Sequence, residues 1–329
     1  MELWALPFMQ RALIAALLSG LVAPAIGMFI VQRKLSLLGD GLGHVAIMGV
    51  GLAFLTGTAP LPTAMVTCVV AAVAVELLRQ RGKATGDLGL AILFYGGIAS
   101  GVMMAGIAGQ GAAGLSAYLF GSLTSVSSSD LWAIGILGVV VLVLTIGLGP
   151  RLFAVAVDED YAHVLGIRVQ LLNLLIVVLA AVTISISMRT VGLLLISALM
   201  VIPVATSQQL FIGFKAAFFG AMGVGVVAAL IGTVGSFYLD SATGATIVVG
   251  SIGLLALSWM VAGPLRRHRN FIPYVEDHPH GALDYERAED HDDSHAHAPG
   301  VQTIQHGDHL DYVHDGHRHA LHGDHYDEH

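Results

Sequence analysis

The sequence predicts an all-α protein: a polytopic membrane helix bundle of about 8–9 transmembrane helices, followed by a polar C-terminal tail. Hydrophobic residues make up 55% of the 329 residues and charged residues only 12%, whereas proteins average about 25% charged. The mean hydropathy is +0.77. The apolar residues are grouped in stretches of about 20, the length that crosses a hydrocarbon core as a helix. Too few charges remain to cover a water-facing surface.

Nine apolar stretches are expected to span: residues 9–32, 41–57, 61–79, 87–109, 131–149, 170–188, 191–209, 216–238 and 245–262. Two polar breaks separate some of them. Residues 111–130 predict a short helix and turn on the outer side, and residues 150–169 predict a polar segment on the cytoplasmic side. Most basic residues fall in alternate loops, which the positive-inside rule assigns to the cytoplasm. The N-terminus is then outside and the C-terminus inside.

Charge divides the chain into two regions. Residues 1–275 hold 13 basic and 9 acidic residues, a net of +4, whereas residues 276–329 hold 2 and 14, a net of −12. The second region also contains 13 of the 16 histidines. We therefore expect a transmembrane domain over 1–265 and a cytoplasmic, acidic, His-rich, disordered tail over 266–329. The composition of the tail is typical of disordered chains.

Asp40 and His44 are the first candidate site, within GDGLGHVA at residues 39–46. Four residues apart on a helix, they share one face with Cβ atoms roughly 5–6 Å apart. A carboxylate oxygen and an imidazole nitrogen can hold one divalent ion. An ionisable residue at membrane depth costs at least about 2.5–3.5 kcal/mol, which favours a functional role. The pattern is equally compatible with a helix-capping Asp40 and a hydrogen-bonded interior His44.

The tail is the second candidate site. HGDHLD at 306–311 and HGDHYD at 322–327 repeat, with HDGHRH at 314–319 between them. Clustered imidazoles and carboxylates bind zinc, copper or nickel. The candidate ligands are His306, Asp308, His309, His314, His317, His319, His322, Asp324 and His325. We interpret the tail as a metal buffer or sensor, because it is too polar to enter the membrane.

Several motifs are absent. The chain has no GxxxxGK[ST] loop for ATP, no HExxH and no GxSxG, and its basic residues are too few and scattered for a nucleic-acid surface. The sequence therefore predicts no enzyme and no nucleic-acid partner.

Five segments carry a family resemblance: QRKLSLLGDGLGHVAIMGVGLA (32–53), LSAYLFGSLTSVSSSDL (115–131), VDEDYAHVLGIRV (157–169), MRTVGLLLISALMVIPVATS (188–207) and YLDSATGATIVV (238–249). In this order they resemble the permease subunits of the zinc/manganese/iron ABC importers, of the ZnuB type. The resemblance runs from about residue 8 to residue 262.

The resemblance implies a multi-pass permease of the plasma or inner membrane that works by alternating access. Asp40 and His44 would lie in the permeation pathway. Residues 158–167 would couple to a cytoplasmic ABC ATPase subunit, through Asp158, Asp160, Ala162 and Gly166. The other implied partners are a second copy or a paralogous permease, an extracellular metal-binding protein and membrane lipid.

The resemblance implies no permanently bound cofactor. Zn²⁺ is the expected cargo, with Mn²⁺ or Fe²⁺ as the alternative within the family. Two readings from other classes also stay open: a stand-alone proton-coupled metal carrier, and a metal-sensing membrane protein in which the tail is the functional part.

Overall fold

The computed structural model describes residues 6–81, 86–122, 126–193 and 195–269, and within the tail residues 302–306, 309–314, 317–322 and 325–328. The chain divides into two compact units, Met1–Leu265 and Arg266–His329. Each unit is described by itself.

Every regular element of the first unit is a helix, over the residues described. The helices are α1 (Pro7–Gln32), α2 (Leu38–Thr56), α3 (Pro60–Gln80), α4 (Gly86–Ile107), α5 (Gly111–Phe120), α6 (Ser128–Gly147), α7 (Gly149–Val157), α8 (Glu159–Val164), α9 (Val169–Ser187), α10 (Ile196–Leu210), α11 (Phe214–Leu239) and α12 (Thr243–Arg269). Eight of them are long and apolar enough to cross a membrane: α1, α2, α3, α4, α6, α9, α11 and α12. The predicted all-α membrane bundle is confirmed.

The stretch predicted as a span over 191–209 is shorter than expected. Its helix, α10, has 15 residues and is therefore about 22 Å long, less than the roughly 30 Å of a hydrocarbon core. The residues before it turn back onto α5, where the Leu193 N–H donates to the Tyr118 carbonyl at 2.8 Å. Hydropathy alone could not separate this turn from the helix, because both are apolar.

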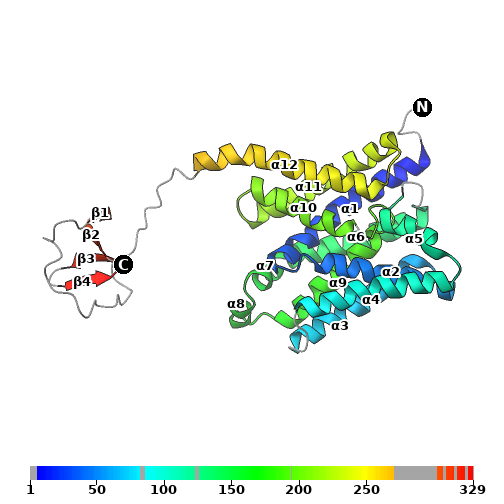
Figure 1. The fold of residues 1–329 in the computed structure, drawn as a ribbon, viewed down its shortest axis with the longest axis horizontal. Helices are drawn as coiled ribbons and strands as arrows, with labels where there is room; N and C mark the ends of the chain where they lie inside the picture. Colours follow the sequence, from blue (N-terminus) through cyan, green and yellow to red (C-terminus); the bar gives the residue numbers. More distant parts are fainter. Residues whose placement is uncertain are drawn as a thin grey trace. The chain divides into compact units, whose positions relative to one another are not determined.

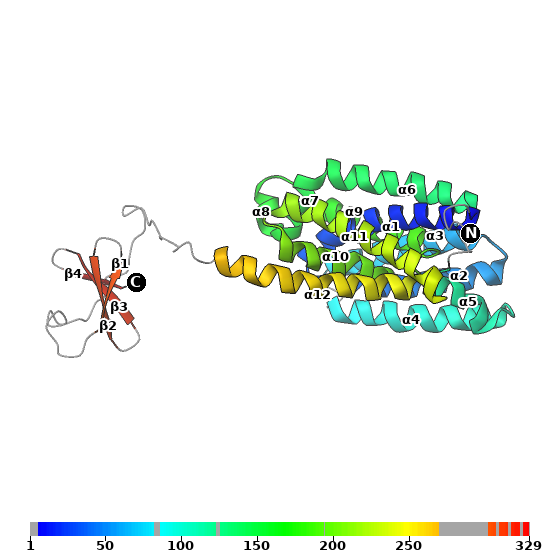
Figure 2. The ribbon, with the colours of Figure 1, turned by 90° about the horizontal axis from the view of Figure 1, so that it is seen from above.

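Three helices form the centre of the bundle. In α1, α2 and α9, 72%, 67% and 67% of the most apolar window is buried, against 22–28% in α3, α4, α6 and α12. Figure 2 shows α4 and α6 on opposite outer sides. Small residues allow the central helices to approach closely. A Cβ on Gly20 of α1 would lie 2.7 Å from the Gly225 carbonyl oxygen of α11.

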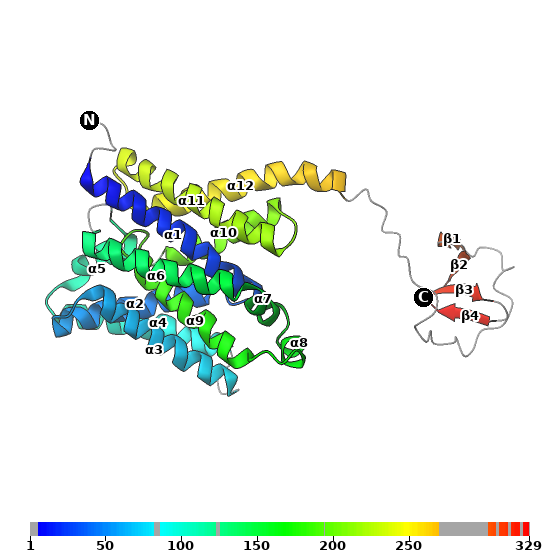
Figure 3. The ribbon, with the colours of Figure 1, turned by 180° about the vertical axis from the view of Figure 1, so that it is seen from behind.

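The two ends of the bundle differ (Figures 1 and 3). The α1–α2 connection, the end of α3, α7 and α8 gather at one end, and α5 lies at the other. We call these the α8 end and the α5 end. The α8 end carries Arg33, Lys34, Arg79, Arg151 and Arg168, so the positive-inside rule predicts that it faces the cytoplasm.

Within the second unit, the structure describes four short strands between residues 302 and 328. They are β1 (Gln302–His306), β2 (His309–His314), β3 (His317–His322) and β4 (His325–Glu328), paired antiparallel in the order β1-β2-β3-β4. The strands are separated in the sequence by Gly-Asp, Asp-Gly and Gly-Asp, pairs typical of two-residue hairpin connections. The polar composition of the tail outweighed these turn dipeptides in the prediction from sequence. Residues 270–301 lie outside the described residues.

Candidate functional site

Asp40 lies in the first turn of α2, and its carboxylate makes a tertiary contact. Oδ1 accepts a hydrogen bond from Ser197 Oγ on α10. The N-cap position of α2 belongs to Leu37, not to Asp40. The capping interpretation of Asp40 is therefore wrong, and the carboxylate is held between two helices instead.

His44 lies one turn further along α2, beside an aromatic ring of a neighbouring helix. Its ring packs against Phe94 of α4, with the ring centroids 4.5 Å apart. Its Nδ1 is buried and has no hydrogen-bond partner in the described part of the chain. An unpaired buried polar atom costs about 1–3 kcal/mol. The interpretation of His44 as a hydrogen-bonded interior residue is not supported.

Asp40 and His44 belong to a partly open stripe on a buried helix. Asp40, His44, Met48 and Leu52 recur every four residues and are half-buried, while most of the residues between them are buried. Residues at this spacing share a helix face. The neighbouring α4 approaches closely here, because a Cβ on Gly97 would lie 2.6 Å from the His44 carbonyl carbon. Asp40 and His44 therefore lie along one half-buried face of the central helix α2.

The segment predicted to couple to an ATPase forms the short helix α8. Its N-cap is Asp158, whose Oδ1 accepts a hydrogen bond from the Tyr161 N–H at 2.9 Å, so Asp158 stabilises the segment itself. Asp160 is exposed. The exposed surface also carries large apolar side chains: Tyr161 and Val164 are 59% and 84% exposed. Large exposed apolar side chains at the end of a protein are typical of a docking surface.

Ala162 and Gly166 have local structural roles. Ala162 is fully buried, so its side chain lies beneath the segment. Gly166 has φ +72°. The Gly166 N–H donates to the His163 carbonyl and the Ile167 N–H to the Ala162 carbonyl, both at 3.0 Å. These are the two bonds of a Schellman motif, which favours glycine at this position.

Glu159 is a residue of this segment that the sequence interpretation missed. Its Oε1 accepts a hydrogen bond from Arg33 Nη2 at 3.1 Å, across from the end of α1. In the sequence Glu159 looks like one acid of a solvated loop. The signal that could have found it is the presence of Arg33, Glu76 and Arg79 at the ends of neighbouring spans.

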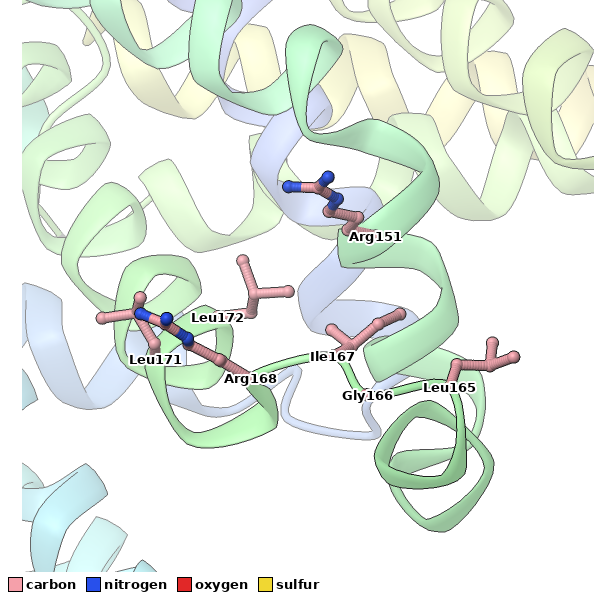
Figure 4. A pocket seen from close by; sticks show the side chains of 7 residues that line it. All are labelled: Arg151, Leu165, Gly166, Ile167, Arg168, Leu171 and Leu172. Carbon is pink, nitrogen blue, oxygen red and sulfur yellow. The ribbon is translucent and has the colours of Figure 1, made fainter.

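A cavity of about 520 Å³ opens beside α8. It is lined by Arg151, Leu165, Gly166, Ile167, Arg168, Leu171 and Leu172. Figure 4 shows Arg151 of α7 and Arg168, just before α9, on two sides of it. Within the described residues no ion pair is recorded for either arginine. The cavity therefore combines apolar walls with two available guanidinium groups.

The tail histidines fall at defined register positions. The pairs His306/His309, His314/His317 and His322/His325 face one another where successive strands connect, and His319 lies inside β3. Asp308 and Asp324 lie outside the described residues. The strand register therefore groups the candidate tail ligands into pairs, whereas the sequence showed only a cluster of histidines.

Comparison with known proteins identifies the family of this chain. A family model, described as the ABC 3 transport family, matches residues 5–262. The manganese transport system membrane protein MntC of Halalkalibacterium halodurans is 32% identical over 78% of this chain and 88% of its own length. The zinc uptake protein ZnuB of Haemophilus influenzae is 30% identical over 75% and 95%. The chelated iron transport protein YfeD of Yersinia pestis is 31% identical over 79% and 86%.

A solved structure shows the same architecture. PsaBC from Streptococcus pneumoniae, in complex with Fab, matches with a TM-score of 0.73 and 28% identity, over 82% of this chain and 96% of that one. The relatives carry different metals in their names, so zinc is not singled out among them. This multi-pass membrane chain belongs to the ABC 3 transport family, as a permease subunit rather than an enzyme.

Proposed function

We propose that this permease imports a divalent metal ion, and that the ion passes Asp40 and His44. The observation that carries the proposal is the buried, unpaired Nδ1 of His44, one helical turn from a carboxylate. Both side chains lie on the partly open stripe of a central helix. A polar atom that is costly to leave unpaired is explained by a ligand that comes and goes. The names of the relatives, which specify manganese, zinc and iron transport, support the same ligand class.

Zinc is the cargo that the ligand chemistry favours. Imidazole suits zinc, whereas carboxylate, carbonyl and water ligands suit manganese. Two copies of the chain, or one copy and a paralogue, would supply two carboxylates and two imidazoles, enough for a tetrahedral ion. Such a site must also release its ion, so we expect weak and transient binding. Manganese and iron are the alternative cargoes.

The remaining parts of the transport cycle follow from the two ends of the bundle. Cytoplasmic ATPase subunits would dock on the apolar face of α8, beside the cavity that contains Arg151 and Arg168. An extracellular metal-binding protein would deliver the ion at the α5 end. ATP-driven alternating access would expose Asp40 and His44 to each side of the plasma membrane in turn. The tail would lie in the cytoplasm.

The test is uptake of radioactive zinc into proteoliposomes that contain the permease and its ATPase. We expect Asp40→Asn and His44→Ala to reduce uptake by about tenfold or more, since even supporting residues of metal sites contribute this much. Asp240→Asn is the matched control, because Asp240 is exposed, ends α11 and has φ +47°, which Asn tolerates. Near-normal uptake by both variants would remove the assignment.

The same vesicles test the cargo and the class of transporter. Competition by unlabelled zinc, manganese and iron should show zinc as the strongest competitor, and a stronger effect of manganese or iron would replace zinc as the cargo. Uptake by the permease alone, without ATPase and ATP, would instead support a proton-coupled carrier.

We also propose that the tail binds metal, and the strand register favours this second role. The register pairs His306 with His309 and His322 with His325, where β1–β2 and β3–β4 connect at one end of the sheet. His314 and His317 pair at the opposite end, where β2 and β3 connect, and His319 lies within β3. Histidine is a ligand type that zinc accepts, so four histidine positions at one end of the sheet support a zinc site there.

Zinc titration of the full-length protein tests the tail. Replacing His306, His309, His322 and His325 by Asn should remove more zinc binding than replacing His314, His317 and His319. Equal losses of zinc binding would contradict a site confined to the end of the sheet that carries the first four histidines. No loss in either variant would end the proposal for the tail.

A further inference from the structure

A partly buried cluster of charged side chains connects α8 to the membrane-spanning helices. Arg33 follows the end of α1, and Glu76 lies near the end of α3. Their side chains are each only 3% exposed. The Glu76 carboxylate receives two hydrogen bonds from Arg79, at 2.9 and 3.0 Å. The cluster holds two positive and two negative groups once Glu159 is included, so its charges balance.

Glu159 is the point at which three helices meet. Its Oε1 accepts hydrogen bonds from Arg33 at 3.1 Å, from Asn173 of α9 at 3.0 Å and from Arg79 at 3.4 Å. Burial alone would raise the pKa of the Glu159 carboxyl. Arg79, Arg33 and the hydrogen bonds from Asn173 and Arg33 outweigh burial, so the pKa is lowered. The carboxylate is therefore held in its charged form.

The two sides of α8 have different environments. Tyr161 and Val164 form its exposed apolar side, whereas Glu159 extends from the same six-residue helix into the charged cluster. The backbone of α8 packs mainly against α7 and α9. The connection from α8 to α1 and α3 is therefore made by the side chain of Glu159.

The cluster also lies close in the chain to the candidate metal site. Arg33 precedes the α1–α2 connection, and Asp40 follows only seven residues later, in the first turn of α2. On the other side, α3 packs against α2, where a Cβ on Gly49 would lie 3.2 Å from the Ala64 Cβ. Chain continuity and packing therefore connect Arg33 and α3 to the helix that bears Asp40 and His44.

The cluster has polar atoms available for a second arrangement. Arg33 Nη1 and Asn173 Oδ1 are both buried, and neither has a hydrogen-bond partner among the described residues. Beside Glu159, a donor of Arg33 and an acceptor of Asn173 are thus unpaired within the described part of the chain. Switching elements alternate between discrete sets of contacts, and these two atoms can take part in a second set.

We propose that Glu159 is a positioning residue for transport, which transmits movement of α8 to Arg33, and through the α1–α2 connection to Asp40. The inference rests on the proposed docking of an ATPase on α8. It assigns a separate function to each side of α8: the outer side binds the ATPase, and Glu159 converts that binding into a change at the metal site.

The experiment measures three quantities on the reconstituted complex: ATPase co-purification, ATP hydrolysis and zinc ions moved per ATP. Glu159→Gln keeps the size of the side chain and removes its charge. We expect the ATPase to stay bound and to hydrolyse ATP, while zinc moved per ATP falls about tenfold, within the range of coupling between two protein sites. Val164→Asp, on the outer side of α8, should instead abolish co-purification.

A double variant separates positioning from stability, because Glu159→Gln alone leaves the buried Arg33 with only the more distant Glu76 carboxylate, at 4.0 Å, and weaker pairing of a buried charge is destabilising. Arg33→Met combined with Glu159→Leu removes both charges, and such apolar replacements of buried ion pairs are often neutral or stabilising. We expect a thermal midpoint close to that of the unmodified chain, with zinc moved per ATP still low. Normal coupling in this folded variant would overturn the proposal for Glu159. Retention of the ATPase by Val164→Asp would overturn the docking proposal on which it rests.

Discussion

At the scale of single residues, the membrane unit pairs most of the polar groups that it buries. Glu76 binds Arg79 and Gln80, and the buried Ser207 hydroxyl donates to the Ala217 carbonyl at 2.6 Å. The Nδ1 of His44 departs from this pattern. In an interior where unpaired polar atoms are costly, such an exception indicates a binding role more strongly than the presence of a histidine does.

Gly97 provides a residue-scale test of the packing around His44. A Cβ at Gly97 would lie 2.6–2.8 Å from backbone atoms of His44 and Val45, whereas a Cβ at the adjacent Gly96 would meet nothing within 4 Å. We expect Gly97→Ala to lower the free energy of unfolding by about 1–3 kcal/mol, as overpacking does, and to reduce zinc uptake. The thermal midpoint in detergent and the uptake rate measure the two effects.

Gly96→Ala is the matched control for this packing test. It should be neutral or slightly stabilising, since alanine favours a helix over glycine by roughly 0.5–1 kcal/mol. Similar effects of the two substitutions would show that α4 does not press on His44.

At the scale of elements, α8 depends on its surroundings for its structure. A helix of six residues is far too short to be stable alone in water. Asp158 caps its start, the Schellman bonds close its end, and Glu159 ties it to α1, α3 and α9. The segment is thus held from three directions while its apolar side stays exposed, which suits a docking element that must not collapse into the bundle.

The cap at Gly166 can be tested directly. Its φ of +72° is unfavourable for residues with a Cβ, by roughly 1–2 kcal/mol. Gly166→Ala should therefore loosen the end of α8, increase proteolysis between 164 and 168 and weaken ATPase binding. Gly166→Asn should have a smaller effect, because Asn tolerates this conformation. If Ala and Asn behave alike, the conformation of Gly166 is not what holds the segment.

The attachment of α8 should depend on pH. The pKa of Glu159 is lower in the folded chain than its ordinary value of 4.5, so its ion pairs contribute stability above that value. This contribution is lost as the pH falls through the lowered pKa. We expect amide exchange in α8 to accelerate below pH 4.5, by hydrogen-exchange mass spectrometry corrected for intrinsic rates. Glu159→Gln should lack this acceleration, and an identical acceleration in the variant would assign it to another group.

The elements could be predicted from the sequence where a repeating pattern defined them. Apolar length located the eight long helices, and the spacing of Asp40 and His44 located the candidate ligands. The turn before α10, the contact of Ser197 with Asp40 and the cluster around Glu159 all depend on residues distant in the chain. A single sequence gives no signal for such contacts. The tail strands were missed for another reason, since their turn dipeptides were present but were outweighed by the polar composition.

At the scale of the whole molecule, the two units differ in what stabilises them. Met1–Leu265 buries apolar faces among long helices, around a small number of paired charges. Arg266–His329 is acidic and contains strands of four to six residues. Because the candidate metal pathway and the docking segment both lie in the first unit, transport should not require the second.

Removal of residues 276–329 tests this division of function. The truncation leaves α12 intact and removes a net charge of −12 with 13 of the 16 histidines. We expect the truncated permease, reconstituted with its ATPase, to transport zinc at the rate of the full chain when zinc is saturating, because Asp40, His44 and Glu159 remain in place. The tail should matter only when its ligands can compete for scarce metal. Buffering free zinc from low to saturating levels inside the vesicles should therefore change the uptake rate of the full chain but not that of the truncated one. Complete loss of uptake in a folded truncated protein would place the tail within the transport pathway and contradict the route past Asp40 and His44.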